Sequence, residues 1–158
     1  MNRIRGISVV TGLCAVLAAG SARADGSPFV GRWHWNRAQS TLPPGGPVPN
    51  DLTSEISRAD SHVKWSVTTL TRDLGTEAWH IETFEAAADG ESHPISSDTA
   101  ASCRVASDGL QTTLKGPDGQ SDTQTCTLSA DRKQMTCSGT LTGRDGETVK
   151  YVDVYDRM

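Results

Sequence analysis

The chain has 158 residues, 35% of them apolar, and a formal net charge of −4. Residues 1–24 contain three of the 15 basic residues and none of the 19 acidic ones, so residues 25–158 carry a charge of −7. This balance disfavours a nucleic-acid partner, because a surface that follows phosphates needs clustered Lys and Arg. A domain of this length can bury a core, but the low apolar fraction makes that core thin.

The N-terminal segment has the features of a secretory signal peptide. Arg3 and Arg5 precede an apolar run over residues 7–19, and Ala22-Arg23-Ala24 forms a small-x-small cleavage site. We therefore expect a signal peptide over 1–24, one domain over 25–158, and export to the periplasm or beyond. No later stretch approaches the roughly 20 apolar residues that a spanning helix needs, so we expect no membrane span.

Short alternating segments between turn signals predict an all-β chain. Asp-Gly pairs begin at residues 89, 108, 118 and 145 and favour hairpins, whereas no segment after residue 24 keeps a helical period. We expect an antiparallel up-and-down meander that closes into a single barrel of eight to ten strands, because closure removes exposed edges. The expected strands are 30–36, 51–58, 62–70, 77–87, 91–96, 99–106, 110–115, 121–129, 134–143 and 147–156.

Turn lengths predict which side chains face the interior of the last hairpin. A two-residue turn at Asp145-Gly146 opposes Cys137 to Val154, and it places Val152 and Val154 on the interior face. The loop over 117–119 opposes Leu110 to another interior position, residue 126. Together the turns predict one shared apolar face.

Three cysteines follow the signal segment: Cys103, Cys126 and Cys137. An odd count in an oxidising compartment leaves one disulfide and one free thiol, or no bridge at all. A four-residue loop over 130–133 opposes Cys126 to Cys137 at a non-hydrogen-bonded site, where the Cα separation suits a disulfide. We expect that bridge and a buried free Cys103; the alternative is three packed thiols.

Four tryptophans accompany only two Phe and two Tyr. A register that opposes Trp65 to Trp79 places both indoles on the inner face, and Trp35 is expected to face inward as well. Indoles around a barrel mouth suit a flat apolar ligand, and their N–H groups offer polar contacts. The alternative is that these rings fill the interior, because the chain has few other large side chains.

Both ends of the predicted domain resemble a known family. Phe29-Val30-Gly31-Arg32-Trp33 opens the first strand before a proline-rich loop, and Val154-Tyr155-Asp156-Arg157 ends the last strand. Together they resemble the bacterial lipocalin-like secreted proteins, which have calycin-type barrels. The resemblance implies that Gly31 and Trp33 close one end, that Arg157 covers the Trp33 ring, and that loop 37–50 is lid-like. Alternatively, Gly31 and Trp33 are an ordinary strand glycine and core indole.

The sequence offers no motif for catalysis or for a metal. The four histidines lack metal-binding spacing, and His80 and Glu82 share a strand face that we expect to be solvated. Nucleophile-elbow, metalloprotease and phosphate-loop motifs are absent, and no loop gathers the carboxylates that calcium needs. We assign no catalytic residue, metal or cofactor, and enzymatic activity has no support in the sequence.

These patterns favour an exported lipocalin-like protein that binds a small hydrophobic or amphipathic ligand inside the barrel. Trp35, Trp65 and Trp79 are the expected ligand contacts. The alternative is a filled barrel that acts as an interaction or inhibitor module through its acidic surface and the 37–50 loop. An enzyme would instead need polar groups such as His34 or His80 to converge in the interior. An internal cavity would separate these hypotheses.

Overall fold

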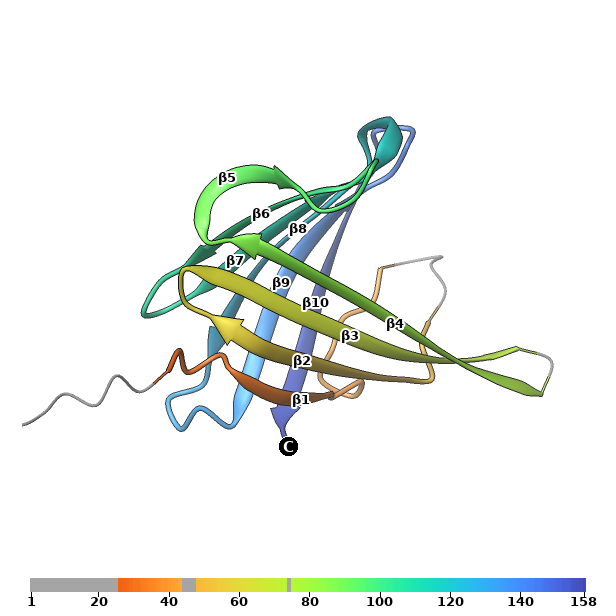
Figure 1. Cartoon of the computed structure of the whole chain (residues 1–158). Helices are drawn as coiled ribbons and strands as arrows, with labels where there is room; N and C mark the ends of the chain where they lie inside the picture. Colours follow the sequence, from red (N-terminus) through yellow and green to blue (C-terminus); the bar gives the residue numbers. More distant parts are fainter. Residues whose placement is uncertain (1–25, 44–47, 74) are drawn as a thin grey trace, which may run out of the picture.

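A computed structural model describes residues 26–43, 48–73 and 75–158. The predicted signal peptide and residues 44–47 of the proline-rich loop lie outside these ranges. The ten predicted strands are confirmed, with bounds within three residues of the prediction, and residues 117–119 form a short 3-10 turn. The strands (Figure 1) are β1 (Gly31–Trp35), β2 (Asp51–Ala59), β3 (His62–Asp73), β4 (Thr76–Ala87), β5 (Asp89–Pro94), β6 (Ala100–Val105), β7 (Leu110–Lys115), β8 (Ser121–Leu128), β9 (Gln134–Thr142) and β10 (Thr148–Arg157).

No helix in the described part of the chain is long and apolar enough to cross a membrane.

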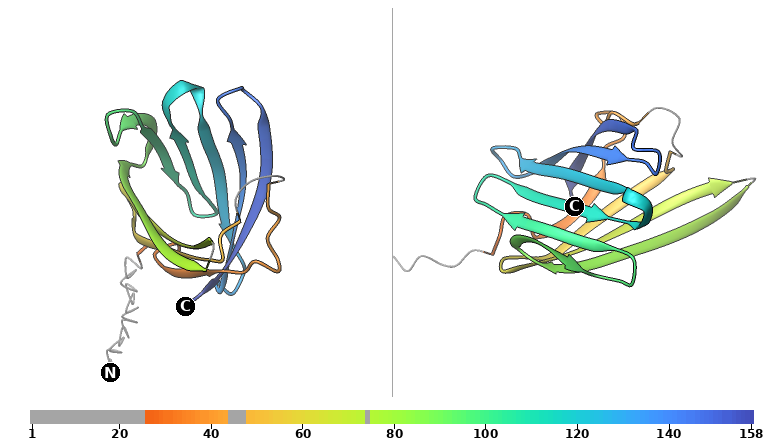
Figure 2. Two further views of the ribbon diagram at one scale, coloured as in Figure 1. Left: turned by 90° about the vertical axis from the view of Figure 1, so that its right-hand side faces the viewer. Right: turned by 90° about the horizontal axis from the view of Figure 1, so that it is seen from above.

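All ten strands belong to one antiparallel sheet in the order β4-β3-β2-β1-β10-β9-β8-β7-β6-β5. The sheet curls strongly (Figure 2) but leaves β4 and β5 as its two edges, so it is a half-barrel, and the prediction of a closed barrel is wrong. The two edge strands do not match. β4 has 12 residues, whereas β5 has six, with a bulge between Asp89 and Ser92 and with Pro94, which has no N–H to donate.

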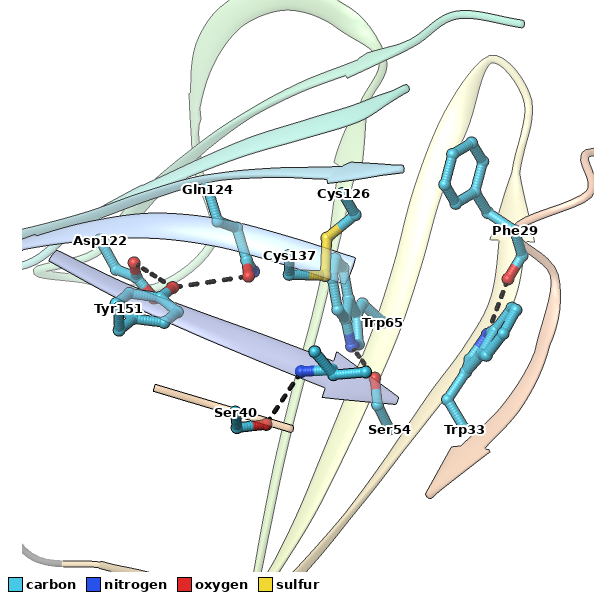
Figure 3. The surroundings of a disulfide bond; sticks show 11 residues. Phe29, Trp33, Ser40, Ser54, Trp65, Asp122, Gln124, Cys126, Cys137 and Tyr151 are labelled. Atoms are coloured by element: carbon cyan, nitrogen blue, oxygen red, sulfur yellow. Dashed lines mark hydrogen bonds between the residues drawn. A yellow bond between two sulfur atoms is a disulfide. The ribbon is translucent and has the colours of Figure 1, made fainter. Parts of the chain in front are cut away.

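The disulfide prediction is confirmed. Cys126 and Cys137 are bonded, and their Cα atoms are 3.9 Å apart (Figure 3). The Ser129 N–H donates to the Gln134 carbonyl over 2.9 Å, so by alternation the two cysteines form a non-hydrogen-bonded pair, where strands approach most closely. Cys103 is free and buried, as predicted; burial raises its pKa to about 11, so the thiol stays protonated at neutral pH.

The predicted register of the last hairpin is wrong by one residue. The Gly143 N–H donates to the Glu147 carbonyl over 2.9 Å, which makes a three-residue loop in which Gly146 takes a φ of 80°. Cys137 therefore faces Asp153. A shift of one residue turns every side chain of a strand to the other face. The interior face of β10 accordingly carries Tyr151, Asp153 and Tyr155 in place of Val152 and Val154.

The segment after β1 continues along the same edge of β10 that β1 pairs with. The Asn36 N–H donates to the Val154 carbonyl over 2.7 Å, and the Val154 N–H donates to the Ser40 hydroxyl over 3.0 Å (Figure 3). Thr41 exchanges two backbone hydrogen bonds with Val152. Val154 is buried, but it is not part of the core cluster of the curled interior.

The register of β3 with β4 also differs from the prediction. Asp73 pairs with Thr76, so the hairpin is longer than expected, and Trp65 faces Phe84. Trp79 lies opposite Leu70 on the outer face with 59% of its surface exposed, so the prediction that it faces inward is wrong. The neighbouring Ile81 is 70% exposed on the same face.

The hydrophobic core is concentrated at one end of the curled sheet. Arg157 lies over Trp33 there, with its guanidinium carbon 4.0 Å from the ring centroid, and it donates hydrogen bonds to three backbone carbonyls. A Cβ on Gly31 would lie 2.6 Å from the Arg157 Nη1, so only glycine leaves room for this contact. The fully buried side chains around it include Phe29, Ile56, Val63, Leu110, Met135 and the disulfide. We call this region the packed end.

Candidate functional site

Away from the packed end, the curled sheet encloses an open cavity of about 340 Å³. We call this region the open end. Its apolar wall comes from β2, β3 and β4, and its polar wall comes from β8 and β10. The apolar wall includes Leu52, Trp65, Val67 and Phe84; the polar wall is Asp122, Gln124, Tyr151, Asp153 and Tyr155. A volume of this size falls in the range of small-molecule sites.

A second space of about 220 Å³ adjoins the cavity and shares four of its lining residues: Leu52, Asp122, Tyr151 and Asp153. Trp35, Leu42, Pro43, Pro49 and Leu141 complete its lining. The described parts of the 37–50 loop therefore border the entrance to the interior. The predicted contact residue Trp35 lines this smaller space, whereas Trp65 lines the larger one.

Tyr151 and Asp122 form the central polar contact of the site. The Tyr151 hydroxyl donates to Asp122 Oδ1 over 2.7 Å and lies 3.5 Å from Gln124 Oε1 (Figure 3). The Tyr151 ring packs directly over Gly139, where an added Cβ would come within 2.1 Å of it. Burial and the Asp122 charge raise the pKa of Tyr151, so its hydroxyl remains a proton donor.

Asp153 is held in a similar way from the neighbouring strand. Trp35 Nε1 donates to Asp153 Oδ1 over 2.9 Å. Burial raises the pKa of the Asp153 carboxyl, while hydrogen bonds from Trp35 and Tyr155 oppose that rise. Burial also raises the pKa of Asp122; the Tyr151 hydrogen bond opposes this change and the Asp153 charge adds to it. Both carboxyl groups are therefore disfavoured as ions relative to ordinary surface aspartates.

The apolar wall is built around two aromatic rings. Trp65 is 2% exposed, and its Nε1 donates to the Ser54 hydroxyl on β2 (Figure 3). The Trp65 and Phe84 ring centroids are 6.3 Å apart with planes tilted by 34°, a separation typical of favourable aromatic pairs. Phe84 lies on the edge strand β4, so this ring pair forms the flank of the cavity beside the open edge.

Sequence reasoning missed the polar wall. Tyr151, Asp153 and Tyr155 were assigned no role because the predicted register turned β10 the other way. Asp122 shares the Cys126 face of β8, so the confirmed β8 register already placed it inside. Glu82 also lines the cavity, although its face was expected to be solvated; its side chain is exposed at the open edge. The Arg157–Trp33 contact that the resemblance implies, extended by alternation along β10, would have placed Tyr151, Asp153 and Tyr155 on the inner face.

The histidines singled out by the sequence do not converge inside. His34 pairs with Asp51 over 2.9 Å, and both side chains are partly exposed. Within the described ranges, no three His, Cys, Asp or Glu side chains are placed to hold a metal ion. The site is thus a hydrogen-bonding and apolar surface in which the two aspartates are the acceptors.

Comparison with protein-family models and with curated proteins finds no match for this chain.

Proposed function

We propose that this protein is an exported, lipocalin-like carrier that binds one small hydrophobic or amphipathic molecule in its curled sheet. The observation that carries the proposal is the open cavity of about 340 Å³, because a filled interior would have no such space. Its aromatic and aliphatic wall supplies apolar contact area, and the few polar groups opposite it supply orientation. Export rests on the signal-like segment 1–24 and agrees with the disulfide.

The cavity also bears on the alternative function. An interaction module acting only through its acidic surface needs no interior space, and its partner binding would weaken with salt. The cavity therefore favours the carrier over that module.

The test is binding of the neutral, polarity-sensitive dye prodan, with unlabelled apolar compounds as competitors. We expect saturable dye fluorescence. Phe84→Ala should weaken dye binding about tenfold, which corresponds to ~1.4 kcal/mol, because it removes one ring of the apolar wall. Trp79→Phe is the matched control: it changes an aromatic residue of the same strand on the outer face, so affinity should stay within twofold. Equal losses in both variants, or no saturable binding, would refute the proposal.

A further inference from the structure

The two walls of the cavity differ in chemistry, and that difference selects a class of ligand. Trp65 and Phe84 stand on the side of β3 and β4, whereas Asp122, Tyr151 and Asp153 stand on the side of β8 and β10. A molecule that satisfies both sides has an apolar body and a polar group at one end. This step rests on the proposed function, because it concerns the same cavity.

The ionisable residues with a net charge preference at neutral pH that line the cavity are all acidic. Three carboxylate residues line it, Glu82, Asp122 and Asp153, and its described lining contains no Lys, Arg or His. None of the ion pairs between described residues involves Asp122 or Asp153. Some surface carboxylates are paired, for example Asp60 with Arg58 and Glu77 with Arg72. Asp122 and Asp153 are half-buried and unpaired, although a buried charge is stable only when it is paired.

The carboxylates have acceptor positions that their present hydrogen bonds do not fill. Asp122 accepts a hydrogen bond from Tyr151, and Asp153 accepts hydrogen bonds from Trp35 and Tyr155. Because an ionised carboxylate has about four acceptor positions, each retains capacity for a donor from the cavity. The donors that hold them belong to side chains at least nine-tenths buried, so the acceptors are fixed before a ligand arrives.

We infer that the ligand is an organic cation, an amine with an aromatic or aliphatic body. Its ammonium group lies against the carboxylates of Asp122 and Asp153, and its body lies against Trp65 and Phe84. The two rings supply apolar contact area for the body of the ligand. The same arrangement rejects anions, which would meet two carboxylates and no positive group.

Three isosteres test this inference on the full protein: 2-phenylethylamine, the neutral 2-phenylethanol and the anionic 3-phenylpropanoate. Their affinities can be measured by titration calorimetry at pH 7. We expect the amine to bind at least tenfold more tightly than the alcohol and the anion to show no binding. Equal affinities of amine and alcohol would overturn the inference while leaving the carrier function in place. No binding of any isostere, with dye binding intact, would also overturn it; loss of dye binding as well would refute both.

Single substitutions test whether the carboxylates of Asp122 and Asp153 cause the preference for the amine. Asp122→Asn and Asp153→Asn keep an acceptor oxygen but remove the charge, so each should reduce amine affinity at least fivefold and leave alcohol affinity within twofold. Asp108→Asn, at an exposed turn, is the control and should leave both affinities unchanged. An amine preference that survives in both cavity variants would overturn the assignment. The isostere comparison uses the unmodified protein and decides the question even where a variant fails to fold.

Discussion

The packed end and the open end use the same ten strands for opposite purposes. At the packed end, Trp33, Ile56, Leu110 and Met135 are all fully buried, and a disulfide bridges two neighbouring strands. Toward the open end, the same strands present carboxylates, hydroxyls and a cavity. Burying apolar side chains is the main favourable contribution to folding, whereas burying charge opposes it. The packed end therefore supplies the stability that lets the open end keep half-buried carboxylates.

The edge strand β4 also differs between the packed end and the open end. Near the packed end, Ala86 and Cys103 are buried as β4 approaches β6. Farther along, the β3–β4 hairpin projects beyond its neighbours (Figure 1), and Trp79 and Ile81 are exposed. Curling thus nearly completes the core at one end and leaves the interior accessible at the other. Three experiments sharpen or break this comparison.

The largest effect is expected from truncating the core on β2. Ile56 is fully buried, so Ile56→Ala should lower the free energy of unfolding by about 2–5 kcal/mol through lost burial and a new void. Leu52 lies on the same face of the same strand but is half-buried beside the cavity. Leu52→Ala should cost less than about 1.5 kcal/mol and should weaken dye binding. Urea denaturation followed by circular dichroism measures both; equal losses would mean that the two ends are packed alike.

A smaller effect is expected from removing the disulfide. The double variant Cys126→Ala/Cys137→Ala should lose about 2–3 kcal/mol of unfolding free energy, because the bridge closes a short loop of the unfolded chain. Dye affinity at the open end should be retained. Cys103→Ala is the control: it removes a buried thiol without opening a loop and should lose about 1 kcal/mol. If dye binding disappears with the bridge, the two ends are not independent.

The sequence predicted the register correctly at the β8–β9 hairpin and incorrectly at the β9–β10 hairpin. The loop over 130–133 is bounded by Ser129 and Gln134, and it placed the cysteines correctly. Asp145-Gly146 is compatible with either a two-residue turn or a three-residue loop with Gly146 in the left-handed region. The two-residue turn, which the prediction assumed, placed Tyr151, Asp153 and Tyr155 on the outer face.

The sequence also offered an argument that gives the correct inner face of β10. If Arg157 covers Trp33, alternation places residues 151, 153 and 155 on the same inner face. Two sequence arguments therefore disagreed, and the structure agrees with the one based on Arg157. The expected strands 77–87 and 91–96 already differed in length, but that mismatch was not used against closure; in the structure β5 is half as long as β4, and both remain edges.

The smallest effect concerns the pH dependence of stability. Burial raises the pKa of Asp122 above 3.8, so between pH 3.8 and the raised value the folded protein binds more protons than the unfolded chain. Stability contributed by this group therefore falls as pH rises through that window and stays lower above it. Asp122→Asn keeps an acceptor for Tyr151 without the charge. It should be more stable than the unmodified protein at pH 7, and the difference should vanish near pH 3.8.

Asp131, in an exposed turn, has a pKa shift in the opposite direction, so its effect on stability changes with pH in the opposite way. Hydrogen bonds from Ser129 and from the Lys133 backbone lower its pKa below 3.8. Its contribution is present above pH 3.8 and is lost as pH falls through the lowered value, so Asp131→Asn should be the less stable protein at pH 7. Urea midpoints between pH 3 and 8 distinguish the two cases. If Asp122→Asn is also less stable than the unmodified protein at pH 7, the Asp122 carboxylate is as well solvated as a surface group. The open end then carries no buried charge at that position.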